Sequence, residues 1–352
     1  MLIKEYDYLV FLGRFQPFHI GHFDVVKKAL EKSYRVIMIV GSYDKAPDIR
    51  NPIDSYARET IIRDTLARHL TPDEYARVYI RHQADHTYNE PKWLASIQQT
   101  VANITIKSGW RDKSPRIGVI GYDKDHTTFY LHKFPQWKTV HVDQEHDVNA
   151  TQIRNTHFGQ IYSLSDDWFI DTDHRQQVKE FLVEATDRHN LIAEWEFVQD
   201  YKELWKSAPY PVNFLTCDAV VIQSAHILVV ERGDFPGKGQ IALPGGHLNQ
   251  KEKLEDGVIR ELREESGLKV PDPVLRGSIV KSDVFDDPER STRGRTVTYA
   301  TYFRLADQEK LPRIKGMDDA KAAWWMPISK FQANRRKIFE DHYSIVENLT
   351  GL

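Results

Sequence analysis

The chain has 352 residues, and its 48 lysines and arginines against 51 aspartates and glutamates give a net charge of −3. This length suits about two domains, and the near balance of charge excludes binding to nucleic acid through bulk charge. The longest apolar runs are strand-sized, well short of the roughly 20 residues that span a bilayer, and the single cysteine, Cys217, allows no disulfide within the chain; we therefore expect a cytoplasmic protein with no membrane partner.

The first 160 residues alternate short β-branched and aromatic runs with longer helical stretches, the pattern of βαβ units around a parallel sheet. We predict strands at 8–12, 35–40, 77–80, 116–120 and 138–142, and helices at 22–33, 54–70 and 91–107. Sequential parallel strands with right-handed crossovers make a doubly wound, Rossmann-like α/β sheet, whose ligands lie beyond the C-terminal ends of the strands. We expect the chemistry in the loops after these strands.

A polar, helix-prone connector over 171–200 separates this N-terminal domain, residues 1–170, from a second domain, residues 201–352. In the second domain we predict one strong helix near 251–266, a helix at the C-terminal end, and strands at 213–222, 227–231, 274–281, 296–304 and 322–326. Strands grouped around one early helix predict an α+β domain.

A distinctive loop, GRFQPFHIGH from Gly13 to His22, follows the first strand and opens into a helix. Gly13 lets the backbone approach a ligand closely, and the start of a helix offers unpaired N–H groups and a positive dipole to an anion. His19 and His22 lie on the same side of the first turn, where both can donate to phosphate oxygens. The alternatives are a turn with two surface histidines, or a fragment of a zinc site, for which no further ligands follow at a suitable spacing.

This loop resembles that of the nucleotidyltransferases with the HxGH signature, and its full length resembles the archaeal-type nicotinamide mononucleotide (NMN) adenylyltransferases. Further matches are Gly41-Ser42, Asn51-Pro52, Arg58-Glu59, residues 121–125 and ATQIR at 150–154. Asn149 stands where that family has serine, and asparagine can still cap a helix. The resemblance implies attack of the NMN phosphate on the α-phosphorus of ATP, giving NAD and pyrophosphate without a covalent intermediate, so that catalysis is positioning and charge stabilisation.

The resemblance also implies roles for individual residues. The residues implied to bind the ATP phosphates and stabilise the transition state are Arg14, His19, His22 and Arg154. The other residues implied for ATP binding are Gly13, Phe15, Gly21, Asp123, Thr151 and Ile153. The residues implied for NMN are Arg58, Asp85, Tyr88, Asn89 and Trp93. A Mg²⁺ would bridge the phosphates, held largely by substrate oxygens and water. For Trp93 the alternative is a half-buried helix aromatic.

A second motif runs through residues 246–268 and is similar at every fixed position to the Nudix box, G-x5-E-x7-R-E-U-x-E-E-x-G-U, where U is aliphatic. At about 100° per residue, Glu261, Glu264 and Glu265 fall on one side of a helix. Carboxylates that close repel each other, which divalent cations or protons relieve, and Arg260 can orient them by ion pairing. The alternative is a solvated helix with surface ion pairs.

Nudix enzymes hydrolyse a nucleoside diphosphate linked to another group, using Mg²⁺ or Mn²⁺ held by such glutamates. The resemblance implies a metal site of Gly245, Glu261, Glu264 and Glu265, with the last two also catalytic. Residues 285–295 resemble a loop of Nudix domains that act on ADP-ribose. This loop implies a water-activating carboxylate at Asp287 or Glu289 and contacts to phosphate or ribose from Arg290, Arg293 and Arg295; a plain solvated loop is the alternative.

Taken together, the two halves resemble the bifunctional bacterial NMN adenylyltransferase/Nudix hydrolases (the NadM/Nudix family). The family implies NAD synthesis in the first domain and hydrolysis of ADP-ribose to AMP and ribose 5-phosphate in the second. The expected partners are small nucleotides (ATP, NMN, NAD and ADP-ribose), and a homo-oligomer stays open. Three alternatives remain: transfer to another phosphate acceptor, a different nucleoside diphosphate substrate for the Nudix half, and a Nudix half that senses ADP-ribose or NAD without cleaving it. The intact glutamates, and the lack of an evident helix-turn-helix segment, argue against a sensor.

Overall fold

The computed structural model describes residues 3–109, 114–122, 130–160 and 164–352. The chain divides into two compact units, the first comprising Met1–Asp44, Arg50–His86 and Glu90–Ile192, and the second comprising Lys45–Ile49, Thr87–Asn89 and Ala193–Leu352. Two short segments from the N-terminal half of the sequence thus belong to the second unit. Among the described residues, no helix combines the length and apolar character needed to cross a membrane.

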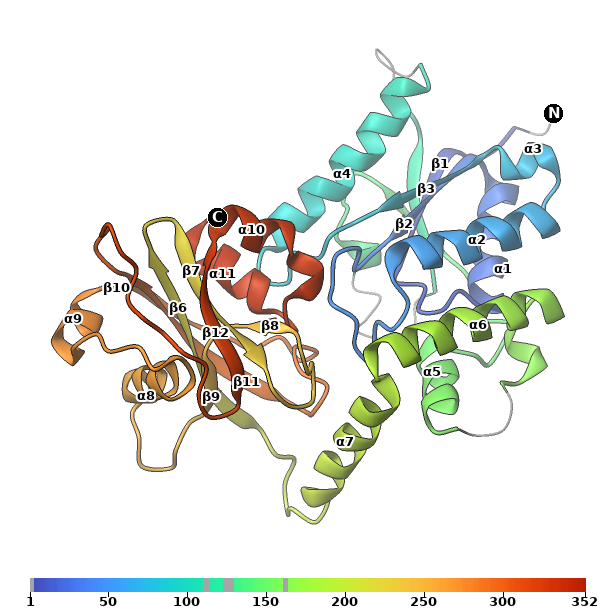
Figure 1. Ribbon diagram of the computed structural model, residues 1–352. Coiled ribbons are helices and arrows are strands. Elements are labelled where there is room, and N and C mark those ends of the chain that lie inside the picture. The colour runs from blue at the N-terminus through green and yellow to red at the C-terminus, as the bar shows by residue number, and fades with distance from the viewer. Residues whose placement is uncertain (1–2, 110–113, 123–129, 161–163) are drawn as a thin grey trace. The chain divides into compact units, whose positions relative to one another are not determined.

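The first unit is built on a five-stranded parallel sheet with the order β3-β2-β1-β4-β5 (Figure 1). Its strands are β1 (Tyr6–Gly13), β2 (Ser33–Val40), β3 (Val78–His82), β4 (Ile117–Gly121) and β5 (Lys138–His141). The central strand β1 pairs with β2 on one side and with β4 on the other. The strand order therefore reverses at the C-terminal end of β1, the position where doubly wound sheets bind ligands. The prediction of a doubly wound parallel sheet is confirmed.

Helices cover this sheet on both faces. They are α1 (Ile20–Lys32), α2 (Ser55–His69), α3 (Pro72–Tyr75), α4 (Glu90–Lys107), α5 (Ala150–Phe158) and α6 (Thr172–His189). Side chains alternate along β1: Leu9 and Phe11 join a core with α1, α2 and α6, whereas Tyr8, Val10 and Leu12 join a second core with α4. This alternation follows from the period of two in a strand, and it leaves both faces of the sheet buried.

The second unit is a mixed sheet between helices, with the strand order β10-β11-β6-β7-β12. Its strands are β6 (Phe214–Gln223), β7 (His226–Arg232), β8 (Ile241–Ala242), β9 (Gly245–His247), β10 (Ile279–Phe285), β11 (Thr296–Arg304) and β12 (Ala320–Pro327). Its helices are α8 (Leu254–Ser266), α9 (Asp272–Gly277), α10 (Ile328–Ala333), α11 (His342–Thr350) and, except for its first two residues, α7 (Leu191–Leu204). The apolar sides of α8 and α11 belong to different cores, as expected for helices on opposite faces of one sheet.

Two segments differ from the expectations in an informative way. The strand predicted at 274–281 is wrong in its first half, because residues 272–277 form α9 and β10 starts only at Ile279. Pro271 at the helix cap and Pro273 in the first turn favour a helix start and cannot donate to a strand ladder. The predicted connector consists of α6, which adds Val178 and Leu182 to a core of the first unit, followed by α7.

Candidate active sites

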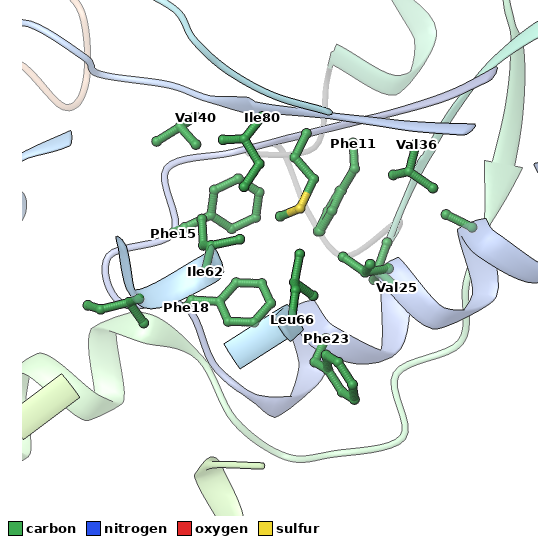
Figure 2. Packing of buried hydrophobic residues seen from close by; sticks show 14 of the residues in the cluster. Phe11, Phe15, Phe18, Phe23, Val25, Val36, Val40, Ile62, Leu66 and Ile80 are labelled. Carbon is green, nitrogen blue, oxygen red and sulfur yellow. The ribbon is translucent and has the colours of Figure 1, made fainter. Parts of the chain in front are cut away.

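The GRFQPFHIGH loop is held in place by its buried side chains, which include both phenylalanines and the polar residues Gln16 and His19. Phe15 and Phe18 are 2% and 1% exposed and point into the core shared with Phe11 and Ile62 (Figure 2), while Arg14 is exposed. A Cβ at Gly13 would come within 2.8 Å of the Phe15 ring, so that this turn requires glycine. The ring of Phe15 is thus part of the core, and the ATP contact expected of this residue can come only from its main chain.

The two histidines of the loop lie together at the start of α1. Their rings stack with centroids 3.7 Å apart, and the main-chain N–H of His19 donates to Nδ1 of His22 at 3.2 Å. Because Nδ1 accepts, a neutral His22 carries its proton on Nε2, which is then a donor. Gly21 lies close beneath them: a Cβ there would meet the His19 ring at 3.3 Å, and its carbonyl accepts from the Tyr122 hydroxyl at 2.8 Å.

The start of α5 joins the same site. Asn149 caps this helix by accepting from the main-chain N–H of Gln152 at 2.8 Å. Arg154, one turn on, is 5% exposed and donates to the Gln16 carbonyl at 2.6 Å and to the Thr151 hydroxyl at 3.0 Å. The structure therefore brings α5 to a loop 138 residues away in the sequence. Ile153 is fully buried in the core, so its side chain is not available to ATP.

Arg58 has a structural task that the sequence does not reveal. The residue is 1% exposed, and its guanidinium donates to the main-chain carbonyls of Arg14, Gly41 and Ser42, the last two at 2.8 and 3.0 Å. It therefore ties the loop after β1 to the loop after β2, and contact with NMN stays a prediction. Asp85 strengthens this junction, since its carboxylate accepts from the main-chain N–H and the hydroxyl of Ser42 at 3.1 and 2.8 Å.

The remaining residues expected at the NMN end have different partners. Trp93 packs on Phe134, with ring centroids 6.2 Å apart. Tyr88 and Asn89 belong to the second unit, where the Tyr88 hydroxyl donates to Asp341 at 2.5 Å. Burial and the charge of Asp341 raise the pKa of Tyr88. Asp123, expected at the ATP site, lies outside the described residues.

In the second unit, α8 is held so that its glutamates meet the preceding loop. Its apolar side is buried, and Gly267 ends it in the left-handed conformation at φ 62°. A Cβ at Gly246 would come within 2.7 Å of the Glu261 carboxylate, and one at Gly245 within 2.3 Å of Asp218 Oδ1. The loop can therefore lie against these carboxylates only because both residues are glycine. The main-chain N–H of Gly245 donates to Glu265 at 3.0 Å.

The carboxylates of α8 form a site that is short of positive charge. Burial, with the nearby Glu261, raises the pKa of Glu265 to about 8, although the hydrogen bond from Gly245 opposes this shift. Burial likewise raises the pKa of Glu261. Arg260 donates to Glu261 and Glu264 at 2.8 and 2.6 Å and also binds Glu252.

With the arginine so placed, no group of three or more His, Cys, Asp or Glu side chains in the described ranges is arranged to hold a metal. The donor set nevertheless suits a divalent cation, which would offset the burial and the repulsion that raise both pKa values.

The three arginines expected to contact ADP-ribose have different surroundings. Arg290 is 6% exposed and forms a two-pronged ion pair with Asp341 at 2.9 and 3.0 Å, so it is part of the core and not available to a phosphate. Arg295 donates to the main-chain carbonyl of Asp286. Arg293 is half-buried and lies over the Tyr201 ring, with 6.0 Å between guanidinium carbon and centroid.

Sequence reasoning missed two residues beside Glu265. The positive charge of Arg232 opposes the rise in the pKa of Glu265, and the negative charge of Asp218 adds to it. Asp218 is 5% exposed and accepts from the Thr298 hydroxyl at 2.5 Å. An aspartate inside the apolar strand CDAVVI was a usable signal, because a buried carboxylate needs a partner or a function.

Comparison with known proteins matches both halves. Residues 10–156 match the cytidylyltransferase-like family model, and residues 213–349 match the NUDIX domain model. A nicotinamide/nicotinic acid mononucleotide adenylyltransferase from Acinetobacter baylyi is 35% identical over 155 residues, which are 44% of this chain and 77% of that protein. An ADP-ribose pyrophosphatase from Methanocaldococcus jannaschii is 29% identical over 147 residues, which are 42% of this chain and 79% of that protein.

One similar structure covers both units. It is the crystal structure of a bifunctional NMN adenylyltransferase/ADP ribose pyrophosphatase from Francisella tularensis, which is 34% identical, covers 98% of this chain and 99% of that chain, and has a TM-score of 0.89. The same Francisella protein complexed with AMP and a manganese ion also has a TM-score of 0.89. The chain therefore belongs to the family of bifunctional NMN adenylyltransferase/ADP-ribose pyrophosphatases.

Proposed function

We propose that the first unit transfers the adenylyl group of ATP to NMN, giving NAD and pyrophosphate, and that the second unit hydrolyses ADP-ribose to AMP and ribose 5-phosphate. The observation that carries this proposal is the likeness to a bifunctional enzyme over nearly the whole chain, with both motifs complete. We place both reactions, on small nucleotides, in the cytoplasm, where the single cysteine stays reduced.

In the first unit, the chain supplies hydrogen-bond donors and positive charge for the reaction from its own side chains. His22 offers its Nε2 proton, and the N-terminus of α1 adds its dipole. Arg154 is held by Gln16 and Thr151 with its charge beside the loop, and exposed Arg14 stands at the loop's start. These groups hold the ATP phosphates and stabilise the charge that grows as the NMN phosphate attacks the α-phosphorus. A Mg²⁺ bound with ATP would add positive charge to the phosphates.

In the second unit, Glu261, Glu264, Glu265 and the Gly245 carbonyl would hold Mg²⁺ or Mn²⁺. When bound, the cation would activate a water and neutralise the diphosphate. The chain prepares this site in two ways: Gly245 orients Glu265 through its N–H, and Arg260 releases Glu261 and Glu264 while it keeps its bonds to Glu252 and to the His247 carbonyl.

Product analysis tests the proposal directly. The purified chain is incubated with Mg²⁺ and either NMN plus ATP or ADP-ribose alone, and the products are separated by chromatography. We expect NAD and pyrophosphate in the first reaction, and AMP and ribose 5-phosphate in the second. If NAD does not form although ATP is consumed with another phosphate acceptor, the proposal for the first unit is wrong. If ADP-ribose binds and stays intact, the proposal for the second unit is wrong.

A further inference from the structure

One buried histidine of the first unit lies outside both motifs. His174 is 0% exposed and stands in the first turn of α6. This helix belongs to the segment predicted to be a connector, and it lies beyond residue 156, where the match to the cytidylyltransferase-like family model ends. A buried polar side chain costs free energy that an apolar one avoids, so its presence in a core points to a partner or a function.

The start of α6 is fixed beside α2 in the first unit (Figure 1). Asp171 caps α6 by accepting from the main-chain N–H of His174 at 2.5 Å. The other carboxylate oxygen of Asp171 lies 2.5 Å from Nε2 of His69, the last residue of α2. Further along α6, Gln177 donates to Asp64 of α2 at 2.6 Å. The main chain of His174 therefore has a defined position relative to α2.

The His174 imidazole is neutral and its orientation is fixed. Its Nδ1 accepts from the main-chain N–H of Ile170 at 3.3 Å, so the neutral ring carries its proton on Nε2. This Nε2 makes no hydrogen bond to the described residues. Burial lowers the pKa of His174 to about 4, although the charge of Asp171 opposes this shift. At neutral pH the ring therefore brings no charge to the first unit and acts through packing.

The His174 ring packs against two phenylalanines. The Phe169 ring lies at a centroid distance of 5.5 Å and the Phe18 ring at 6.0 Å, with 75° and 61° between the planes. Phe18 is 1% exposed and belongs to the core shown in Figure 2. Its ring also stacks on the His22 imidazole, with centroids 5.6 Å apart and 22° between the planes. His174 and His22 therefore contact the same phenylalanine ring.

The position of the His22 imidazole depends on these neighbours. The main-chain N–H of His19 donates to its Nδ1 at 3.2 Å, and the Phe15 ring meets it edge-on at a centroid distance of 5.0 Å. The stacked Phe18 ring restricts the tilt of the imidazole. Alignment of a donor with a reacting phosphate matters, because a displacement of about 1 Å can cost on the order of a hundredfold in rate.

We propose that His174 is a positioning residue for adenylyl transfer: its ring holds Phe18 in place, and Phe18 keeps the His22 imidazole aligned with the ATP phosphates. The inference rests on the adenylyl transfer proposed for the first unit. It extends the machinery of that reaction into α6, past the matched family model and into the predicted connector. His174 contacts no substrate in this arrangement and acts only through Phe18.

The test compares two substitutions that differ in the ring. His174→Leu and His174→Phe both remove the acceptor of the Ile170 N–H, but only His174→Phe keeps a ring against Phe18. Val183→Ala is the control on the same helix, since Val183 is 41% exposed. The readouts are kcat and the KM values for ATP and NMN in NAD formation. Circular dichroism shows that the variants fold, and hydrolysis of ADP-ribose in the same samples shows that the second unit is intact.

We expect His174→Leu to lower kcat for NAD formation about tenfold, with both KM values within about twofold of the wild type, because binding persists while alignment is lost. His174→Phe should restore the rate to within about threefold of the wild type, and Val183→Ala should leave it unchanged. Equal kcat values in His174→Leu and His174→Phe would overturn the inference. If His174→Leu does not fold, His174→Asn, which also lacks the ring, takes its place in the comparison.

An NMR measurement separates failure of this inference from failure of the proposed function. The signal of the His22 Cε1–H group, identified by its absence in His22→Ala, senses the ring current of Phe18. We expect this signal to move in His174→Leu and to stay close to its wild-type position in His174→Phe. If the wild type forms no NAD, the adenylyl-transfer proposal fails, and the signal still tests the packing. A His22 signal that is unmoved in His174→Leu contradicts the inference.

Discussion

The two sites meet the same problem, the negative charge of a nucleotide phosphate, with opposite electrostatics. At the HxGH loop the chain itself provides hydrogen-bond donors, from His19 and His22, and the positive charge of Arg154, next to a helix N-terminus. At α8 it provides carboxylates, and burial raises the pKa values of Glu261 and Glu265. The first site is ready for an anion as it stands, whereas the second needs a cation before an anion can bind.

Arginine has opposite roles in the two sites. In the first unit Arg154 and Arg58 are held by main-chain carbonyls, which fix the guanidinium without cancelling its charge. In the second unit Arg260 pairs with three glutamates and cancels part of the charge that a metal would otherwise bind. The first site thus depends on how its own arginines are positioned. The proposed metal site of the second unit depends on a cation taking the place of Arg260 at the glutamates.

Loss of one carboxylate from α8 should have the largest effect. We expect Glu265→Gln to lower kcat for ADP-ribose at least about a thousandfold, because metal-ion catalysis contributes several kcal/mol. Adenylyl transfer, measured on the same sample, should be unchanged. A folded variant that loses both activities would contradict the assignment of the two reactions to separate sites.

Loss of a built-in donor should have a somewhat smaller effect. We expect His22→Ala to lower the rate of adenylyl transfer about 10²- to 10³-fold, the usual cost of removing one donor to a transition-state oxyanion. Hydrolysis of ADP-ribose serves as the internal control. A rate within experimental error of the wild type would show that the His22 imidazole does not act on the phosphates.

Substitution of Arg58 distinguishes between two roles for this residue, holding two loops together and contacting the ligand. Arg58→Met removes a buried cation from three carbonyl acceptors, and we expect the first unit to lose roughly 2–4 kcal/mol of its free energy of unfolding. Denaturant unfolding followed by circular dichroism measures this loss. If stability is unchanged and only the KM for NMN rises, Arg58 is a substrate contact and the clamp assignment fails.

Glu194 is another buried carboxylate, and it lies outside the predicted metal site. It therefore shows the effect of burial on a glutamate without a metal. It is 2% exposed, its Oε2 accepts from the Gly237 N–H at 2.8 Å, and burial raises its pKa to about 7. Since the folded-state pKa lies above the ordinary value, its contribution to stability is full at low pH and is lost as the pH rises through about 7.

We expect Glu194→Gln to remove this loss. The variant should gain about 1–3 kcal/mol relative to the wild type between pH 5 and pH 8, at about 1.4 kcal/mol per pKa unit. Urea unfolding of both proteins at the two pH values measures the gain. A difference between the proteins that is the same at pH 5 and pH 8 would show that Glu194 does not titrate as burial implies.

Most sheet strands and both motif loops can be predicted from the sequence because they depend on local patterns; the strand predicted at 274–281 is the exception in its first half. The strand at 296–304 agrees with β11 at both ends, and the GRFQPFHIGH loop lies where a doubly wound sheet binds its ligands. Contacts between side chains that lie far apart in the sequence cannot be predicted in this way. The Tyr88 hydroxyl donates to Asp341, which lies 253 residues away in the sequence, and Arg290 forms an ion pair with the same carboxylate. Neither pairing has a local signal, so the sequence alone does not reveal either contact.

The assignment of Lys45–Ile49 and Thr87–Asn89 to the second unit bears on how the protein is made. Tyr88 leaves the ribosome 253 residues before its partner Asp341, and at roughly 5–20 residues per second this delay is tens of seconds. Pro47 is likewise synthesised long before Gln240, whose side-chain amide donates to the Pro47 carbonyl. The two catalytic units are therefore not independent modules in synthesis: a gene cut between them would give a second unit that lacks parts of its own structure.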